Sequence, residues 1–172
     1  MDEVYLILGS NIGDSKAIME MALNAIGAKL GTITQKSAYY ETAPWGDLEQ
    51  PAYLNLVVAV KPDWKNNIDV KGFATWFMQE LLKIERSLGR KRDANNQFGP
   101  RTIDIDLLSF GKVVMETELL HLPHPRMHLR KFVLVPLCEI APLWMHPILG
   151  KSVEELLTIC PDMGFVIKKD CN

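Results

Sequence analysis

The order of strand-like and helix-like segments in the first 108 residues is the strongest constraint on the fold of this chain. Patterns typical of strands occupy residues 4–8, 32–41, 53–61 and 102–108, and helical patterns follow Asp14 and cover residues 73–88. The resulting β-α-β-β-α-β order predicts an α+β, ferredoxin-like fold, in which both helices cover one face of an antiparallel sheet. We expect the other face to be open. Residues 109–172 should add a short hairpin and short helices to a single domain that spans 1–172.

Composition and charge narrow the class of function. The 172 residues carry a net charge of −2, which gives no general electrostatic reason to bind nucleic acid or an anionic membrane. No apolar run approaches the roughly 20 residues that a membrane-spanning helix needs. Cys138, Cys160 and Cys171 are odd in number and lack CxxC spacing, which favours a reducing compartment. We therefore expect a cytoplasmic monomer that acts on small molecules, not on nucleic acids or membranes.

Two aspartates share one face of the last predicted strand. Asp104 and Asp106 are two residues apart, so their side chains project to the same side about 7 Å apart, while Ile103, Ile105 and Leu107 face the helices. Neighbouring carboxylates repel unless a cation lies between them, and hard oxygen ligands suit magnesium when phosphates complete the shell. A pair of ions about 3.5–4 Å apart could be bridged in this way. Taken alone, the two residues are better explained as solvated acids on an exposed strand.

Basic residues lie next to this acidic pair in the sequence. Arg101 precedes the strand, and Arg90, Lys91 and Arg92 begin a polar loop that covers residues 90–99. A polyphosphate bound through metal needs such groups, because guanidinium forks pair with the remaining phosphate oxygens. The three loop residues could also neutralise the C-terminal dipole of the preceding helix. The combination of the loop, the aspartates and Arg101 favours a polyphosphate site.

Tyr53 and Asn55 form a second candidate group. By period-two alternation they share the face of the aspartates, and they follow a polar segment, residues 42–50, that we predict to be a loop. An Asn carboxamide offers a donor and an acceptor to the edge of a heterocycle, and an aromatic ring can stack on its face. Without the other motifs, an ordinary strand Asn hydrogen-bonded to a loop would be the better explanation.

Two further motifs have weaker implications. Residues 9–13, GSNIG, connect a strand to a helix but lack the ending of a Walker motif, so we interpret them as a tight connection in which any ligand contact is secondary. His124 and His128 have the i,i+4 spacing of some zinc sites, but no acid accompanies them and Pro125 interrupts a helix. We predict instead a cationic segment that contacts phosphates. A solvated surface turn is the alternative.

Together these segments resemble the hydroxymethyl-dihydropterin pyrophosphokinase family of folate biosynthesis over nearly the whole chain. The resemblance rests on the runs LGSN at 8–11, YLN at 53–55, GPRTIDID at 99–106, PHP at 123–125 and PLCEIAP at 136–142. The GPRTxDxD run is the most specific of the five. The resemblance implies a magnesium-dependent kinase, with two ions expected, that transfers pyrophosphate from ATP to 6-hydroxymethyl-7,8-dihydropterin and releases AMP.

The resemblance also implies roles for individual residues. Asp104 and Asp106 match the metal ligands. Residues that match the pterin site are Thr42, Ala43, Trp45, Tyr53, Asn55 and Phe132. Residues that match the ATP site are Arg90, Arg92, Arg101, Leu107, His124 and Arg130. Of these, the catalytic residues implied are Arg90, Arg92 and Arg101. Glu85 matches another position that the family uses, but its role does not follow from the sequence.

The chain also departs from the family, and other protein classes share parts of its pattern. The departures are Leu82, Phe98 and Pro125, which replace a polar residue, a Trp and an aromatic residue, and they affect the expected ATP contacts and loop closure. A palm-like nucleotidyl transferase or cyclase also places paired carboxylates on a ferredoxin-like sheet, but the Tyr53 and Asn55 pair and the short chain argue against it. An RNA-binding sheet would present aromatic residues where this chain has acids. A non-enzymatic structural module leaves the clustering of acids and arginines unexplained.

Overall fold

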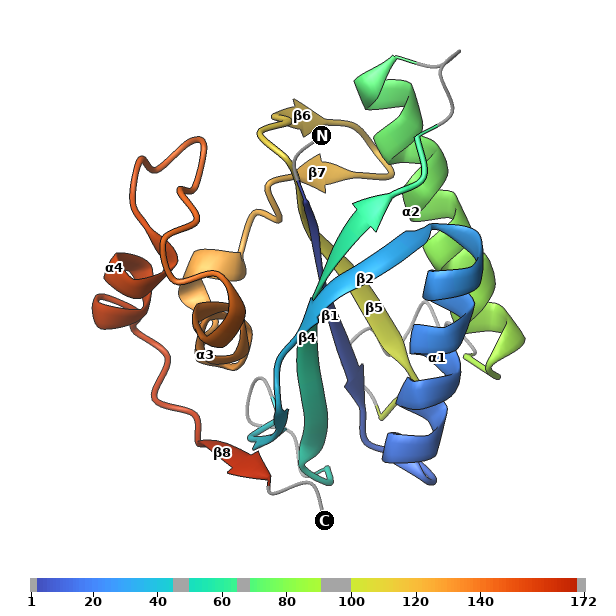
Figure 1. Cartoon of the computed structure of the whole chain (residues 1–172). Coiled ribbons are helices and arrows are strands. Elements are labelled where there is room, and N and C mark those ends of the chain that lie inside the picture. The colour runs from blue at the N-terminus through green and yellow to red at the C-terminus, as the bar shows by residue number, and fades with distance from the viewer. Residues whose placement is uncertain (1–2, 45–49, 65–68, 91–99, 170–172) are drawn as a thin grey trace.

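The three longest strands of the sheet, β1 (Val4–Ser10), β4 (Tyr53–Pro62) and β5 (Asp104–Phe110), lie side by side. β1 lies between the other two and is antiparallel to both (Figure 1). The remaining strands of this sheet are β2 (Gly31–Lys36), β3 (Tyr39–Thr42) and β8 (Val166–Lys169). β2 and β3 both pair with β4, and β8 pairs with β3, which leaves β5 at the opposite end of the strand order.

The computed structural model describes residues 3–44, 50–64, 69–90 and 100–169. Parts of both predicted loops, residues 45–49 and 91–99, lie outside these ranges. The sequence-based assignments of Trp45, Arg92 and Phe98 therefore fall outside the described residues. Within the described ranges, no helix is both long enough and apolar enough to cross a membrane.

Helices α1 (Ser15–Lys29) and α2 (Val70–Ser87) cover one face of the sheet, as predicted (Figure 1). α2 begins three residues before the apolar pattern does, because the Asp69 side chain accepts hydrogen bonds from the backbone N–H groups of Lys71 and Gly72, both at 3.0 Å. The core on this face contains alternate residues of β1, β4 and β5 and the apolar stripes of both helices. Its largest fully buried side chains include Leu6, Leu56, Phe73, Phe77 and Ile84.

The second face of the sheet is only partly open, so the prediction of a fully open face is wrong. Helices α3 (Lys131–Ile140) and α4 (Val153–Thr158) lie over it in Figure 1. Their apolar side chains form a second core with Ile7, Val57 and Leu108 of the sheet. The cause lies in β1, whose seven residues are all buried: a strand that is apolar on both faces needs cover on both. The polar end of this face, around Gly9, is outside the second core.

The C-terminal half contains the expected hairpin and short helices, and one strand that the sequence did not indicate. β6 (Met115–Glu116) and β7 (His121–Leu122) form the hairpin, and a 3-10 turn at Met127–Leu129 precedes α3. The predicted strand at 32–41 is divided into β2 and β3. β8 was missed because its four residues are mostly exposed and find their partner only through the fold.

Candidate active site

Polar side chains of the site form a row across the three long strands β4, β1 and β5. Gly9 of β1 is paired with Asn55 of β4 on one side and with Asp104 of β5 on the other. Residues that face each other across antiparallel strands project to the same face, so the Asn55 and Asp104 side chains flank Gly9. In the next row, Ile7 is paired with Asp106. The register confirms the prediction that both aspartates share one face with Asn55.

The Asn55 side chain is held from the neighbouring strand. Asn55 and Thr42 are both buried, and Nδ2 of Asn55 donates a hydrogen bond to Oγ1 of Thr42 at 2.7 Å. The next residue, Ala43, donates its backbone N–H to the carbonyl oxygen of Phe165 at 3.1 Å. The segment before β8 therefore supports the edge of the Asn55 site. Sequence reasoning missed Phe165, because no local pattern pairs segments so far apart in the chain.

Asp104 is paired with two arginines. Nη1 of Arg90 donates to Oδ1 of Asp104 at 2.6 Å and to the carbonyl oxygen of Ile103 at 2.8 Å. Nη1 of Arg101 donates to the other oxygen, Oδ2. The side chains of Arg90, Arg101 and Asp104 are 11%, 19% and 21% exposed, so these pairs lie at the boundary with solvent, where a ligand can reach them.

Glu85 supports this cluster from the α2 side. Its side chain is buried, Oε1 accepts a hydrogen bond from the backbone N–H of Ile105 at 2.8 Å, and Oε2 lies 4.0 Å from Nε of Arg90. The carboxylate thus joins α2 to the start of β5 and holds Arg90 beside the acidic pair. The sequence signal for this role is an acid placed on the apolar stripe of the helix, between Leu81 and Leu88.

Asp106 lies in a less polar environment than Asp104. Burial and, to a smaller extent, the Asp104 carboxylate raise the pKa of Asp106 to about 7 against the opposing effect of the Arg130 guanidinium. Arg130 is itself buried, and its guanidinium carbon lies 5.6 Å from the ring centroid of Phe132. Arg130 and Phe132, at the start of α3, are therefore brought to the same region as the predicted metal ligands.

His124 differs from the predicted cationic segment. Burial and the charges of Arg130 and Arg126 lower the pKa of His124 to about 4, so its imidazole is neutral near pH 7. Its Nδ1 accepts a hydrogen bond from the backbone N–H of Arg126 at 3.2 Å, which places the remaining proton on Nε2. His124 is therefore a neutral hydrogen-bond donor, and the positive charge of this segment belongs to Arg126, Arg130 and Lys131.

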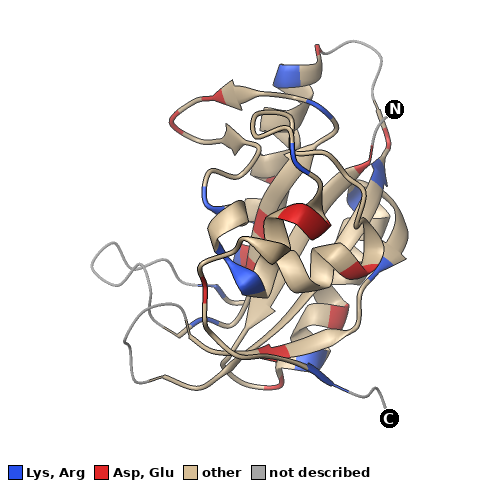
Figure 2. Ribbon diagram, turned by 90° about the vertical axis from the view of Figure 1, so that its left-hand side faces the viewer, with Lys and Arg blue, Asp and Glu red and all other residues tan. Residues whose placement is uncertain are grey.

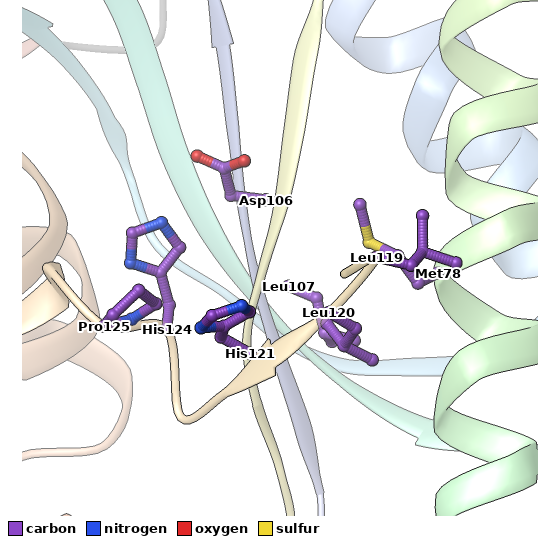
Figure 3. A pocket seen from close by; sticks show the side chains of 8 residues that line it. All are labelled: Met78, Asp106, Leu107, Leu119, Leu120, His121, His124 and Pro125. Carbon is purple, nitrogen blue, oxygen red and sulfur yellow. The ribbon is translucent and has the colours of Figure 1, made fainter. Parts of the chain in front are cut away.

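A cavity of about 260 Å³ lies at the outer edge of β5, next to these groups (Figure 3). Figure 3 shows Asp106 and His124 on one side of the space and Met78 of α2 on the other. The full lining consists of Met78, Asp106, Leu107, Leu119, Leu120, His121, His124 and Pro125. The cavity thus joins an apolar region, suited to a flat aromatic base, to a polar region at Asp106, which could meet phosphates through a bound cation.

The two aspartates are the candidate metal ligands. In the part of the chain that the structure describes, no three His, Cys, Asp or Glu side chains converge into a metal-binding group. Two carboxylates fit magnesium, because this ion commonly binds one or two protein acids and completes its shell with waters and substrate phosphates. The raised pKa of Asp106 supports the fit, because like charges this close favour either a proton or a cation.

Charges are mixed on the side of the molecule that carries α3 and α4. Figure 2 shows acidic and basic segments interspersed among the described elements of that side, not a surface of one sign. Such a distribution gives those residues no broad positive face for a nucleic-acid backbone. The basic side chains that matter are instead concentrated beside Asp104 and Asp106.

Comparison with known proteins places the chain in a family. A sequence profile described as 7,8-dihydro-6-hydroxymethylpterin-pyrophosphokinase (HPPK) matches residues 5–142. The protein named 2-amino-4-hydroxy-6-hydroxymethyldihydropteridine pyrophosphokinase in Methylorubrum extorquens is 41% identical over 158 residues, which cover 91% of this chain and 92% of that protein. The protein of the same name in Bacillus subtilis is 39% identical over 137 residues, covering 79% of this chain and 76% of the relative.

Solved structures agree on the fold. A crystal structure of wild-type Plasmodium falciparum HPPK-DHPS superposes with a TM-score of 0.68 at 16% identity, over 91% of this chain and 43% of that chain. A crystal structure described as HPPK-DHPS in complex with substrates superposes with a TM-score of 0.65 at 15% identity. This chain spans less than half the length of those proteins, and at such identity the likeness concerns the fold.

The fold is of the α+β, ferredoxin-like type, and the family profile and the named relatives give the class of protein as a pyrophosphokinase. The profile covers most of the chain, and the alignment with the Methylorubrum extorquens protein covers 92% of that relative. The chain belongs to the 7,8-dihydro-6-hydroxymethylpterin-pyrophosphokinase family.

Proposed function

We propose that this chain transfers a pyrophosphate group from ATP to 6-hydroxymethyl-7,8-dihydropterin, giving AMP and the dihydropterin diphosphate in folate biosynthesis. The row Asn55–Gly9–Asp104 is the observation that best supports this proposal. Adjacent strands lie about 4.8 Å apart, so a group suited to a heterocycle and a group suited to metal and phosphate are about 10 Å apart on one rigid sheet. Family membership and the names of the relatives support the same reaction.

The pterin is proposed to bind over Gly9 and Asn55. The Asn55 carboxamide, oriented by Thr42, would pair with the amide and amino groups along one edge of the ring. Tyr53 and Phe132 would stack on its two faces, and the backbone near Ala43 would complete the pocket. Trp45, which the family resemblance also assigns to this site, lies outside the described residues.

ATP is proposed to bind in the cavity at the edge of β5. Met78, Leu107 and Leu119 would contact the base, and the polyphosphate would extend toward Asp106. The Nε2–H of His124 can donate to a phosphate oxygen without adding charge. Arg90, Arg101 and Arg130 would pair with the remaining oxygens, and Arg92 would join them from outside the described ranges.

In the proposed reaction the hydroxymethyl oxygen forms a bond to the β-phosphorus of ATP. The bond from that phosphorus to the oxygen that bridges it to the α-phosphorus breaks, and AMP leaves with this electron pair as the alcohol proton is released. Magnesium bound through Asp104 and Asp106 would supply neutralisation of phosphate charge. The protein contributes alignment of the two substrates, charge stabilisation by Arg90 and Arg101, and exclusion of water.

Several finer features are part of this proposal. They are a requirement for magnesium, two ions in the active complex, a single domain over residues 1–172, a monomeric state and a cytoplasmic location. The magnesium requirement is supported by the acidic pair. The two-ion arrangement is supported by the separation of Asp104 and Asp106 on adjacent rows of the sheet.

The direct test is an incubation with ATP, magnesium and the hydroxymethyl-dihydropterin, followed by separation of nucleotides. AMP should form in equal amount to the dihydropterin diphosphate, and its formation should require the pterin. ADP as the nucleotide product would indicate transfer of a single phosphoryl group and would overturn the proposal. AMP formation at the same rate with and without the pterin would overturn the proposal too.

A further inference from the structure

Asn11 lies in the connection between β1 and α1, two residues after Gly9, and the proposed reaction gives its side chain no role. It holds both backbone groups of Arg101: its backbone N–H donates to the Arg101 carbonyl oxygen at 3.2 Å, and its side-chain Oδ1 accepts from the Arg101 backbone N–H at 2.8 Å. Arg101 is in neither a helix nor a strand, so no regular hydrogen-bond pattern fixes its backbone. The two hydrogen bonds to Asn11 fix the backbone of Arg101 instead.

The same carboxamide also holds the chain on the other side of the site. Its Nδ2 donates to the carbonyl oxygen of Pro51 at 3.1 Å and lies 3.4 Å from Oε1 of Gln50. The Tyr53 hydroxyl donates to the same Gln50 Oε1 at 3.4 Å. Asn11 is thus joined to the segment that leads directly into Tyr53 and Asn55.

We propose that Asn11 is a positioning residue that fixes the distance between the pterin-binding side and the arginine side of the site. Its oxygen faces Arg101 and its nitrogen faces Pro51, so the two sides are attached to opposite ends of one planar group. A carboxamide carries its donor and its acceptor on two separate atoms, so one short side chain can bind both segments at once. This inference rests on the proposed function, because the two sides are defined by the two substrates.

The pterin-binding side and the arginine side also interact directly, so a change in the distance between them would affect both. The Tyr53 side chain interacts electrostatically with Arg101 and hydrogen-bonds to it. A shift of either anchored segment would change this contact together with the Arg101–Asp104 pair. In a reaction whose catalysis is mainly alignment, a displacement of about 1 Å can lower the rate on the order of 100-fold.

Two substitutions distinguish the contribution of the side-chain acceptor of Asn11 from that of its side-chain donor. Asn11→Asp has the same shape, keeps an acceptor for the Arg101 N–H, and replaces the donor to Pro51 by an oxygen that repels its carbonyl. Asn11→Leu has nearly the same shape and removes both interactions. Asn24 lies exposed on α1, so Asn24→Asp and Asn24→Leu are matched controls for charge and for polarity.

We expect Asn11→Asp to raise the KM for the pterin about tenfold and to leave the KM for ATP within about twofold, since one lost hydrogen bond corresponds to roughly a factor of ten. Asn11→Leu should in addition lower kcat by about tenfold or more. Both Asn24 variants should match the wild type. Unchanged kinetics in both Asn11 variants would overturn the inference. Equal weakening of ATP and pterin in Asn11→Asp would overturn it as well, because that is the pattern of a general structural role.

Amide hydrogen exchange gives a readout that does not depend on catalysis. The Arg101 amide should lose protection in Asn11→Leu and keep it in Asn11→Asp, whereas equal protection in both would overturn the anchoring of Arg101. If the wild type releases no pterin-dependent AMP, the proposed function fails, and the exchange pattern still decides whether Asn11 anchors Arg101.

Discussion

A β-carbon at Gly9 would lie 2.6 Å from Oδ1 of Asn55, a distance that real side chains do not tolerate. The Asn55 carboxamide therefore rests directly against the backbone of β1. Asn55 is also bonded to Thr42 on its other side, so it is held between two strands. The conformation of Gly9 is ordinary, and the absence of a side chain is what the site requires.

The substitution Gly9→Ala should weaken pterin binding. The added methyl group must displace the Asn55 carboxamide and break its 2.7 Å bond to Thr42, so we expect about a tenfold rise in the pterin Kd and little change for ATP. Titration calorimetry with each ligand measures both values. Gly27→Ala is the control, because nothing lies within 4 Å of a β-carbon at this helical position. Unchanged pterin affinity in Gly9→Ala would show that Asn55 does not contact the ring.

Replacing Asn55 itself should produce a larger difference between the effects on pterin affinity and on ATP affinity. Buried ligand groups left without a partner cost about 1–3 kcal/mol, so Asn55→Ala should weaken pterin binding by roughly one to two orders of magnitude. Affinity for ATP and magnesium should stay nearly constant, because Asp104 and the arginines remain in place. Calorimetry decides the matter. A parallel loss of both affinities, or of neither, would remove Asn55 from the pterin site.

The placement of Asp104, Asp106 and Asn55 on one face could be predicted because side-chain alternation in strands is a local property. Each strand was recognisable from its own residues, and the β-α-β-β-α-β order fixed their arrangement. The cover on the second face could not be predicted in the same way. It depends on contacts between β1 and helices more than a hundred residues away, although the all-apolar run of β1 was a sign that both faces are buried.

The roles of Glu85 and His124 could not be read from the sequence either. The role of Glu85 depends on its hydrogen bond to Ile105, which lies 20 residues further along the chain. The charge of His124 depends on burial and on two arginines. Such electrostatic properties arise only when several segments are brought together.

Removal of the Glu85 carboxylate should destabilise the protein as well as the site. Glu85→Ala leaves the Ile105 N–H and the Arg90 guanidinium without their buried partner, which should lower the free energy of unfolding by about 2–4 kcal/mol. Glu85→Gln keeps an acceptor for Ile105 and should lose less. Thermal unfolding of both variants tests this. The control is Glu80→Ala, which breaks the ion pair of Glu80 with the exposed Lys83 on the same helix. Equal stability of the two alanine variants would contradict the assigned role.

Arg101 should matter more in the transition state than in nucleotide binding. Its guanidinium is already oriented by Asp104 and its backbone by Asn11, so it can contact the transferring group without rearrangement. Arg101→Ala should therefore lower kcat by a larger factor than it raises the Kd for ATP. We expect the same behaviour from Arg92, although this residue lies outside the described ranges. Equal losses in kcat and affinity would identify Arg101 as a simple nucleotide-binding group.

The ionised form of Asp106 should lower the stability of the metal-free protein, although the proposed metal binding requires that form. Burial and the nearby Asp104 carboxylate raise the pKa of Asp106 to about 7 in the folded protein, well above the ordinary value that applies in the unfolded chain. The folded state therefore binds the proton more tightly. In the absence of divalent metal, stability from this group is present below about pH 4 and is lost as pH rises toward 7. Asp106→Asn mimics the protonated form, so it should remove this loss. Because the side chain keeps partial contact with solvent, we expect a gain of about 1–2 kcal/mol at pH 8, or about 2–8 °C in Tm.

The same variant should have no measurable pterin-dependent AMP release, because the candidate metal ligand is gone. Thermal unfolding in chelator between pH 5 and 8, together with the AMP assay, measures both effects on one preparation. Asp63→Asn is the matched control, because it makes the same change of charge at an exposed position. If Asp106→Asn and the wild type lose stability in parallel as pH rises, the electrostatic conflict is not located at Asp106. If the variant keeps near-wild-type activity, Asp106 does not bind the metal.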